Sequence, residues 1–158
     1  MSKLFTPKIT IKYLRRIFIY CRYRMLHKIQ TADNTFVTLD VKQLKSELCL
    51  AIKKWPSLLT FTFDETKKLN DIMQTIETGN YICKDYGMIK KWSQTFKISI
   101  SSFRGSTNFQ IRERLTGNYT GFGKLWISLP SYKIKEFKMH LATCIQEFAA
   151  LSKDNNPM

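Results

Sequence analysis

The chain has 158 residues, of which 44% are hydrophobic and 13% aromatic, so it is long and apolar enough for one folded domain and is not a disordered tail. Its 26 Lys and Arg residues against 12 Asp and Glu residues give a formal net charge of +14. This excess predicts a polyanionic partner, with nucleic acid first and an acidic membrane surface second. No uncharged run approaches the ~20 residues of a transmembrane helix.

Residues 1–30 form a basic N-terminal arm that holds eight Lys and Arg residues and no acid. Leu14, Ile17, Phe18, Cys21 and Met25 have helical spacing within it. Four interpretations stay open: a packing element of the fold, an arm that contacts nucleic acid, an organellar targeting peptide, or a membrane-surface helix.

The first half of the remaining chain, about residues 31–80, reads as three strands and a helix. Residues 36–41, 48–52 and 59–63 alternate apolar and polar side chains as strands do. Asp64 is a plausible N-cap and Gly79 a suitable stop for the helix that follows. The apolar stripe of this helix is Leu69, Ile72, Met73 and Ile76.

The second half, about residues 81–151, repeats this order. Part of residues 80–93 supplies a first strand, residues 96–101, 109–114 and 124–129 read as further strands, and a helix begins near Pro130-Ser131. The apolar face of this helix is Ile134, Phe137, Leu141, Cys144, Ile145 and Phe148. We therefore predict an α+β fold in which residues 31–158 form a single domain. It consists of two repeats of a curved antiparallel β-sheet followed by a long helix, with a short C-terminal tail.

Three pieces of the second half resemble the DNA-binding domain of the positive-cofactor-four family of transcriptional coactivators. They are Ser102-Phe103-Arg104-Gly105, Phe109-Gln110-Ile111-Arg112-Glu113 and Trp126-Ile127-Ser128-Leu129, in the family's order and spacing. The resemblance covers about a third of the chain. Ser106 stands where the family has a lysine, and Leu115 where it has an aromatic residue.

The resemblance implies a particular architecture. Family members pair two such units as a homodimer, and a chain with both copies would form an intramolecular pseudo-dimer. That arrangement is similar to the Whirly family, whose chains hold two such repeats and bind single-stranded DNA. The Whirly Lys-Gly-Lys-Ala-Ala-Leu motif is absent here, so the resemblance carries over the architecture and not the sites.

Single-strand binding requires cations for phosphates and rings for bases. The resemblance matches Arg112 to the family's strand arginine, Arg104 to its turn lysine, Phe103 to its turn aromatic, and Lys124 to its basic approach to the last strand. Alternation points Arg112 away from Phe109 and Ile111, so we expect it on a solvated face. The other candidate binding residues are Lys97, Arg114, Trp126, Tyr119, Phe122 and, by analogy in the first half, Lys53, Lys54 and Trp55.

No catalytic constellation is recognisable, and we expect a protein that is not an enzyme. His140 and Cys144 are four residues apart on the final helix, but Cys144 belongs to its apolar stripe. The glycines of residues 116–123 match neither a Walker loop nor a dinucleotide fingerprint. The four cysteines show no metal-ligand spacing, which predicts reduced intracellular thiols and neither a metal site nor a cofactor.

The sequence thus predicts sequence-independent binding of single-stranded DNA in transcription or replication, in the nucleus or another DNA-containing compartment. The partners expected are the single strand, the transcription or replication machinery and a further copy of the chain, without a membrane. The alternatives are an RNA-binding protein of the same fold, or a structural subunit of a polymerase or ribonucleoprotein complex.

Overall fold

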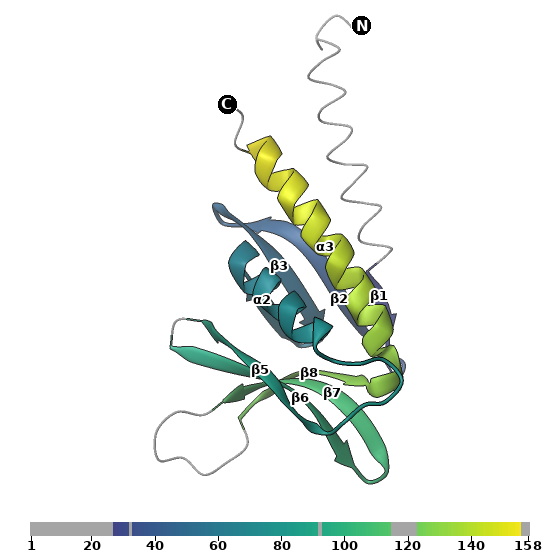
Figure 1. Cartoon of the computed structure of the whole chain (residues 1–158). Helices are drawn as coiled ribbons and strands as arrows, with labels where there is room; N and C mark the ends of the chain where they lie inside the picture. Colours follow the sequence, from purple (N-terminus) through teal and green to yellow (C-terminus); the bar gives the residue numbers. More distant parts are fainter. Residues whose placement is uncertain (1–26, 32, 92, 115–122, 156–158) are drawn as a thin grey trace, which may run out of the picture.

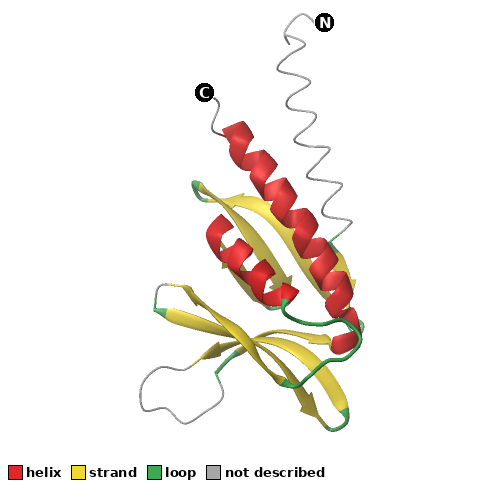
Figure 2. Ribbon diagram, in the orientation of Figure 1, coloured by secondary structure: helices red, strands yellow, loops and turns green. Residues whose placement is uncertain are grey.

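The computed structural model describes residues 27–155 apart from residues 32, 92 and 115–122. It confirms the α+β class, with two four-stranded antiparallel sheets, each followed by a helix (Figures 1 and 2). The first half contains β1 (Lys28–Gln30), β2 (Phe36–Leu44), β3 (Glu47–Lys54), β4 (Ser57–Phe61) and α2 (Phe63–Gln74). The second half contains β5 (Lys84–Lys91), β6 (Gln94–Phe103), β7 (Ser106–Arg114), β8 (Leu125–Pro130), the 3-10 turn η2 (Ser131–Lys133) and α3 (Ile134–Asn155).

The first sheet has the order β1-β2-β3-β4, and its apolar face follows the predicted alternation. Val37, Leu39 and Val41 of β2 are buried, and so are Leu50 and Ile52 opposite them on β3. The end of the predicted basic arm takes part in this sheet, because Lys28–Gln30 form β1 and pair with β2. The arm's residues 1–26 lie outside the described residues.

The start of α2 differs from the prediction, because Thr62 and not Asp64 is the N-cap. The Glu65 amide donates to Thr62 Oγ1 at 3.3 Å, and the Thr62 amide donates to Glu65 Oε1 at 2.8 Å, which completes a capping box. Phe63 is already helical and packs against Phe148 of α3, with ring centroids 5.1 Å apart. The helix ends at Gln74 with Thr75 as its C-cap, so Gly79 lies beyond the helix.

The second sheet has the order β5-β6-β7-β8, and β5 is the strand predicted within residues 80–93. Its pairing with β6 shifts between Asp85 and Gly87. A Cβ atom on Gly87 would lie 2.8 Å from Ile72 Cδ1 of α2, so glycine permits the close approach of helix and strand. Helix α2 therefore packs against a strand of the second sheet.

The two halves share one core because each helix contacts elements of both halves. Figure 1 shows α3 beside α2 over the first sheet, where α3 contacts β2 and β3. From the second half, Phe109 contacts Phe137 at 5.3 Å between ring centroids, and Phe96 contacts Phe61 of the first half at 6.2 Å. The predicted face of α3 is confirmed except at Ile145, which is half-buried; the buried members are Ile134, Phe137, Leu141, Cys144 and Phe148.

Candidate nucleic-acid interface

The face of the second sheet that points away from the core is polar, and we call it the outer face. Along β6 and β7, the side chains of this face alternate with the buried residues Ile98, Ile100, Phe109 and Ile111. Its central side chains are Lys97, Ser99 and Ser101 on β6, and Asn108, Gln110 and Arg112 on β7.

Strand register arranges these side chains in rows across β6 and β7. Lys97 lies opposite Arg112, Ser99 opposite Gln110, and Ser101 opposite Asn108. Successive rows are two residues apart along each strand, or about 6.6–6.8 Å. The rows therefore run from a pair of cations, through two pairs of neutral hydrogen-bonding groups, to the turn that carries Phe103.

This face is hollowed into a groove of about 720 Å³. Besides the six side chains of the rows, its lining includes Lys84 and Asp85 of β5 and Phe103 at the end of β6. Cations, neutral polar groups and an aromatic ring thus line one concavity.

The cations at this face have neighbours in the protein. Lys97 Nζ lies 3.6 Å from Asp85 Oδ1, and Arg114 Nη1 lies 3.5 Å from Met88 Sδ. Arg112 is half-buried and not on a fully solvated face as expected, because its Nη1 donates to the Gly123 carbonyl at 2.8 Å. The hydrogen bond to Gly123 therefore positions Arg112 beside Lys97.

The hairpin turn places an aromatic ring and a guanidinium together at one end of the outer face. Arg104 and Gly105 have φ angles of +50° and +80°, as a type I′ turn requires. Phe103 is 69% exposed, and Arg104 Cζ lies 5.1 Å from the centroid of its ring. The guanidinium thus lies over the Phe103 ring, while most of the Phe103 side chain stays exposed.

Trp126 and Lys124 lie apart from the groove. A β-bulge between Ile111 and Arg112 shifts the register with β8, and Trp126 packs against the core with its ring 6.0 Å from that of Phe96. Its indole Nε1 lies 3.3 Å from Glu113 Oε2, and Lys124 Nζ lies 3.8 Å from the ring centroid. Tyr119 and Phe122 fall outside the described residues.

The first sheet has its own outer face, with matching positions. The β2–β3 hairpin of the first sheet and the β6–β7 hairpin of the second sheet each close with a two-residue turn. Counted from the turn, Lys53 therefore occupies the position on β3 that Arg112 occupies on β7. Lys53 Nζ lies 5.7 Å from the ring of Trp55, which is 81% exposed. Lys54 is half-buried and its Nζ lies 3.5 Å from the Ser128 carbonyl, so it links the two sheets.

Sequence reasoning missed the neutral members of the groove. Ser99, Ser101, Asn108 and Gln110 lie on the same face as Lys97 and Arg112, and the two-residue period already implied this. The predicted site contained charged and aromatic residues only. Lys84 and Asp85 were also missed, because the strand that carries them has no clear alternation.

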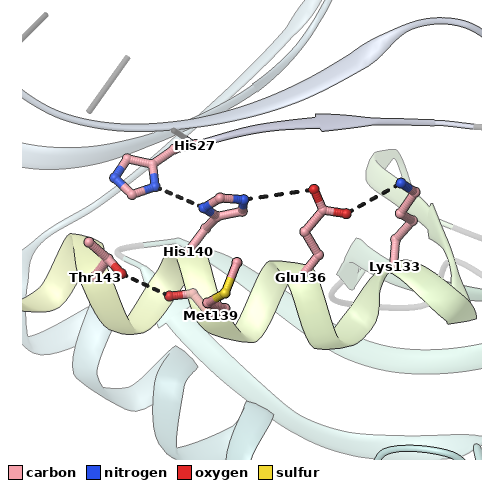
Figure 3. A network of polar contacts seen from close by, with 6 residues as sticks. All are labelled: His27, Lys133, Glu136, Met139, His140 and Thr143. Carbon is pink, nitrogen blue, oxygen red and sulfur yellow. Dashed lines mark hydrogen bonds and ion pairs between the residues drawn. The ribbon is translucent and has the colours of Figure 1, made fainter. Parts of the chain in front are cut away.

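His27 and His140 are buried titratable residues that lie outside the groove. His27 Nδ1 lies 3.1 Å from His140 Nδ1, and Figure 3 shows the chain of contacts continuing to Glu136 and Lys133 of the C-terminal segment. Burial, and then the nearby His140, lowers the pKa of His27 to about 4.

Glu147 of α3 is 3% exposed, and neither carboxylate oxygen has a hydrogen-bond partner in the described structure. Burial, and then the nearby Asp40, raises the pKa of Glu147 to about 8. Burial, then Glu147 and then Asp40, raises the pKa of the Cys144 thiol.

Within the described residues, no group of three or more His, Cys, Asp or Glu side chains is placed to hold a metal ion. None of the helices described has the length and apolar character needed to cross a membrane. No protein-family model and no curated protein matches this chain.

Proposed function

We propose that this protein binds single-stranded nucleic acid on the outer face of the second sheet. The preferred ligand is single-stranded DNA, bound without strong sequence dependence during transcription or replication. The groove that combines Lys97, Arg112 and Phe103 is the observation that carries this proposal.

The groove has the two kinds of group that a single strand needs. Lys84, Lys97 and Arg112 offer positive charge to phosphates, and an exposed Phe103 offers a stacking surface worth ~1–3 kcal/mol per base. Stacking on a side chain requires a base that is free of its partner strand, which favours single strands over duplex. The formal charge of +14 adds a general attraction for polyanions.

We further propose that the two sheets act as the two subunits of an intramolecular pseudo-dimer. The matched register of the two hairpins and the contacts of α2 and α3 with both halves support this. The proposed role is binding and not catalysis. Burial raises the pKa of Cys49 and of Cys144, which disfavours the thiolate form that a nucleophile needs.

A second candidate function is docking into a polymerase or ribonucleoprotein complex. Its support is the first sheet, where Trp55 is 81% exposed, and Phe36 and Leu58 are each 41% exposed. Exposed apolar side chains on one sheet are typical of protein–protein contact. RNA is the alternative ligand for the groove of the second sheet.

The test is a competition between single-stranded DNA, duplex DNA and RNA of one length at physiological salt. Single-stranded DNA should compete best. If ~4–6 phosphates are neutralised, log affinity should fall with log salt with a slope of about −3 to −4. Equal affinity for duplex and single strands, or no salt dependence, contradicts the proposal; preference for RNA supports the alternative ligand.

A further inference from the structure

Two carboxamide side chains on β7 lie between the cations Lys97 and Arg112 and the ring of Phe103. Asn108 and Gln110 are half-buried and line the concavity. In the part of the chain that the structure describes, neither side-chain amide hydrogen-bonds to another protein group. These amides are therefore half-enclosed and still have their hydrogen-bonding capacity to offer a ligand.

Their position matches that of a base and not of a phosphate. The row of Gln110 and Ser99 is next to the cation row of Arg112 and Lys97, and the row of Asn108 and Ser101 is next to Phe103. With phosphates held by the cations and a base stacked on Phe103, the edges of the bases between them would lie over the amide rows. Hydroxyls at Ser99 and Ser101 add neutral donors and acceptors to the same rows.

A carboxamide presents one donor and one acceptor side by side. Adenine presents the complementary pair on two edges, N6/N7 and N6/N1, whereas guanine, cytosine and thymine present it on the Watson–Crick edge alone. Single-stranded bases expose these edges to side chains. Resting on the single-strand binding proposed above, we infer that Gln110 and Asn108 bind base edges and give the groove a preference for adenine.

The first sheet provides an internal comparison. Counting from the hairpin turn, Ala51 and Cys49 of β3 occupy the positions of Gln110 and Asn108. Neither side chain has the paired donor and acceptor of an amide. Asp40, opposite Ala51, is a carboxylate where the second sheet has the Ser99 hydroxyl. The preference for adenine therefore belongs to the second sheet alone, and it is superimposed on the general affinity that the cations supply.

The experiment measures the affinities of full-length wild type, Gln110→Met and Asn108→Leu for oligo(dA), oligo(dC) and oligo(dT) of equal length. Methionine keeps the length of glutamine and removes its donor and acceptor. Gln110→Met should weaken oligo(dA) binding about tenfold relative to oligo(dT). Gln74→Met on the exposed side of α2 is the matched control and should change no affinity.

Gln110→Glu is a second variant of nearly unchanged size. Its two acceptors suit the cytosine N4 amino group, so the ratio of oligo(dC) to oligo(dA) affinity should rise. Two results would overturn the base-reading role and leave the proposed function intact, provided that wild type binds the oligonucleotides. One is that Gln110→Met loses the same affinity for all three oligonucleotides. The other is that Gln110→Glu keeps the wild-type ratio of oligo(dC) to oligo(dA) affinity. Wild type that binds none of the three overturns both.

Discussion

His27, just before β1, and His140, in α3, bring their Nδ1 atoms to 3.1 Å from each other in the interior (Figure 3). One ring donates and the other accepts, so this contact requires at least one neutral imidazole. Glu136 lies 3.8 Å from the far nitrogen of His140 and is itself paired with Lys133. The pair thereby joins the start of the first sheet to the helix of the second half.

We predict that the contribution of His27 to stability falls in mild acid. The pKa of His27 is 6.5 when unfolded and about 4 when folded, so between these values only the unfolded chain takes up the proton. The contribution of His27 to the free energy of unfolding should fall as the pH drops from 6.5 to 4, by up to roughly 3 kcal/mol. Urea melts across this range test it. Because Glu147 acts in the opposite direction, His27→Gln should gain stability relative to wild type as the pH falls from 6.5 to 4, and Lys135→Ala, on an exposed site of α3, should keep the pH profile of wild type.

Glu147 should act in the opposite direction. Its pKa is 4.5 when unfolded and about 8 when folded, so the folded protein holds the extra proton between these values. Stability should therefore fall as the pH rises from 4.5 to 8, and above pH 6.5 the His27 contribution no longer opposes this. Glu147→Gln, which resembles the protonated acid, should remove the decline between pH 6.5 and 8. A decline of the same size in the variant would show that another group causes it.

Arg112→Ala should weaken single-strand binding by about 1–2 kcal/mol, because a charge-assisted phosphate contact is lost. The salt slope should become shallower by nearly one phosphate. Because Arg112 also donates to the Gly123 carbonyl, the melt should show a loss of about 1–2 kcal/mol. Lys135→Ala should leave the affinity, the salt slope and the stability unchanged. A destabilised variant with unchanged affinity would mean that Arg112 is structural and the binding face is elsewhere.

Gly123→Ala should disrupt the hydrogen bond between Arg112 and the carbonyl of residue 123. A Cβ atom at this position would lie 1.6 Å from the Glu113 carbonyl oxygen, so β7 and the chain entering β8 must separate. We expect a loss of at least about 2–3 kcal/mol in thermal or urea unfolding. Gly79→Ala is the control, because its site has a φ of +99° but no atom within 4 Å, so only local strain of about 1 kcal/mol applies. Equal losses at both sites would contradict the close approach.

Phe137→Ala should destabilise both halves together. Phe137 is fully buried and packs on Phe109 from a helix that also covers the first sheet, and its truncation should cost about 3–5 kcal/mol. Amide hydrogen exchange should accelerate in both sheets. Met139→Ala is the control on the same helix, since Met139 is 58% exposed and should change stability by less than about 0.5 kcal/mol. Faster exchange confined to the second sheet would argue against the shared core.

Local patterns predicted most of the elements because their information is local. The alternation of Phe96, Ile98 and Ile100 and the helical spacing of Ile134, Phe137 and Leu141 each identify a face without reference to the rest of the chain. Asp64 and Thr62 are both good capping residues; Glu65 forms the capping box with Thr62, and Phe63, the first helical residue, packs on Phe148. That contact joins residues far apart in the sequence.

The candidate site was predictable only in part for the same reason. Two-residue periodicity places Lys97, Gln110 and Arg112 on one face, but it gives no sign of the bulge beside Arg112 that carries Trp126 to the core. Lys54 appeared equivalent to Lys53 as a surface cation, yet it reaches a carbonyl of β8. Such roles depend on how the sheets meet, which no local pattern records.

The packing of α3 on the first sheet has a consequence for biosynthesis. A ribosome completes β1–β4 well before it reaches residues 134–155, so the nascent first sheet emerges without the helix that covers it. Until then, Leu39, Leu50 and Ile52 belong to a sheet whose apolar face is incompletely covered. Exposed strands of this kind are prone to aggregation and are a substrate for chaperones. The order of translation thus delays completion of the shared core until the second half has been made.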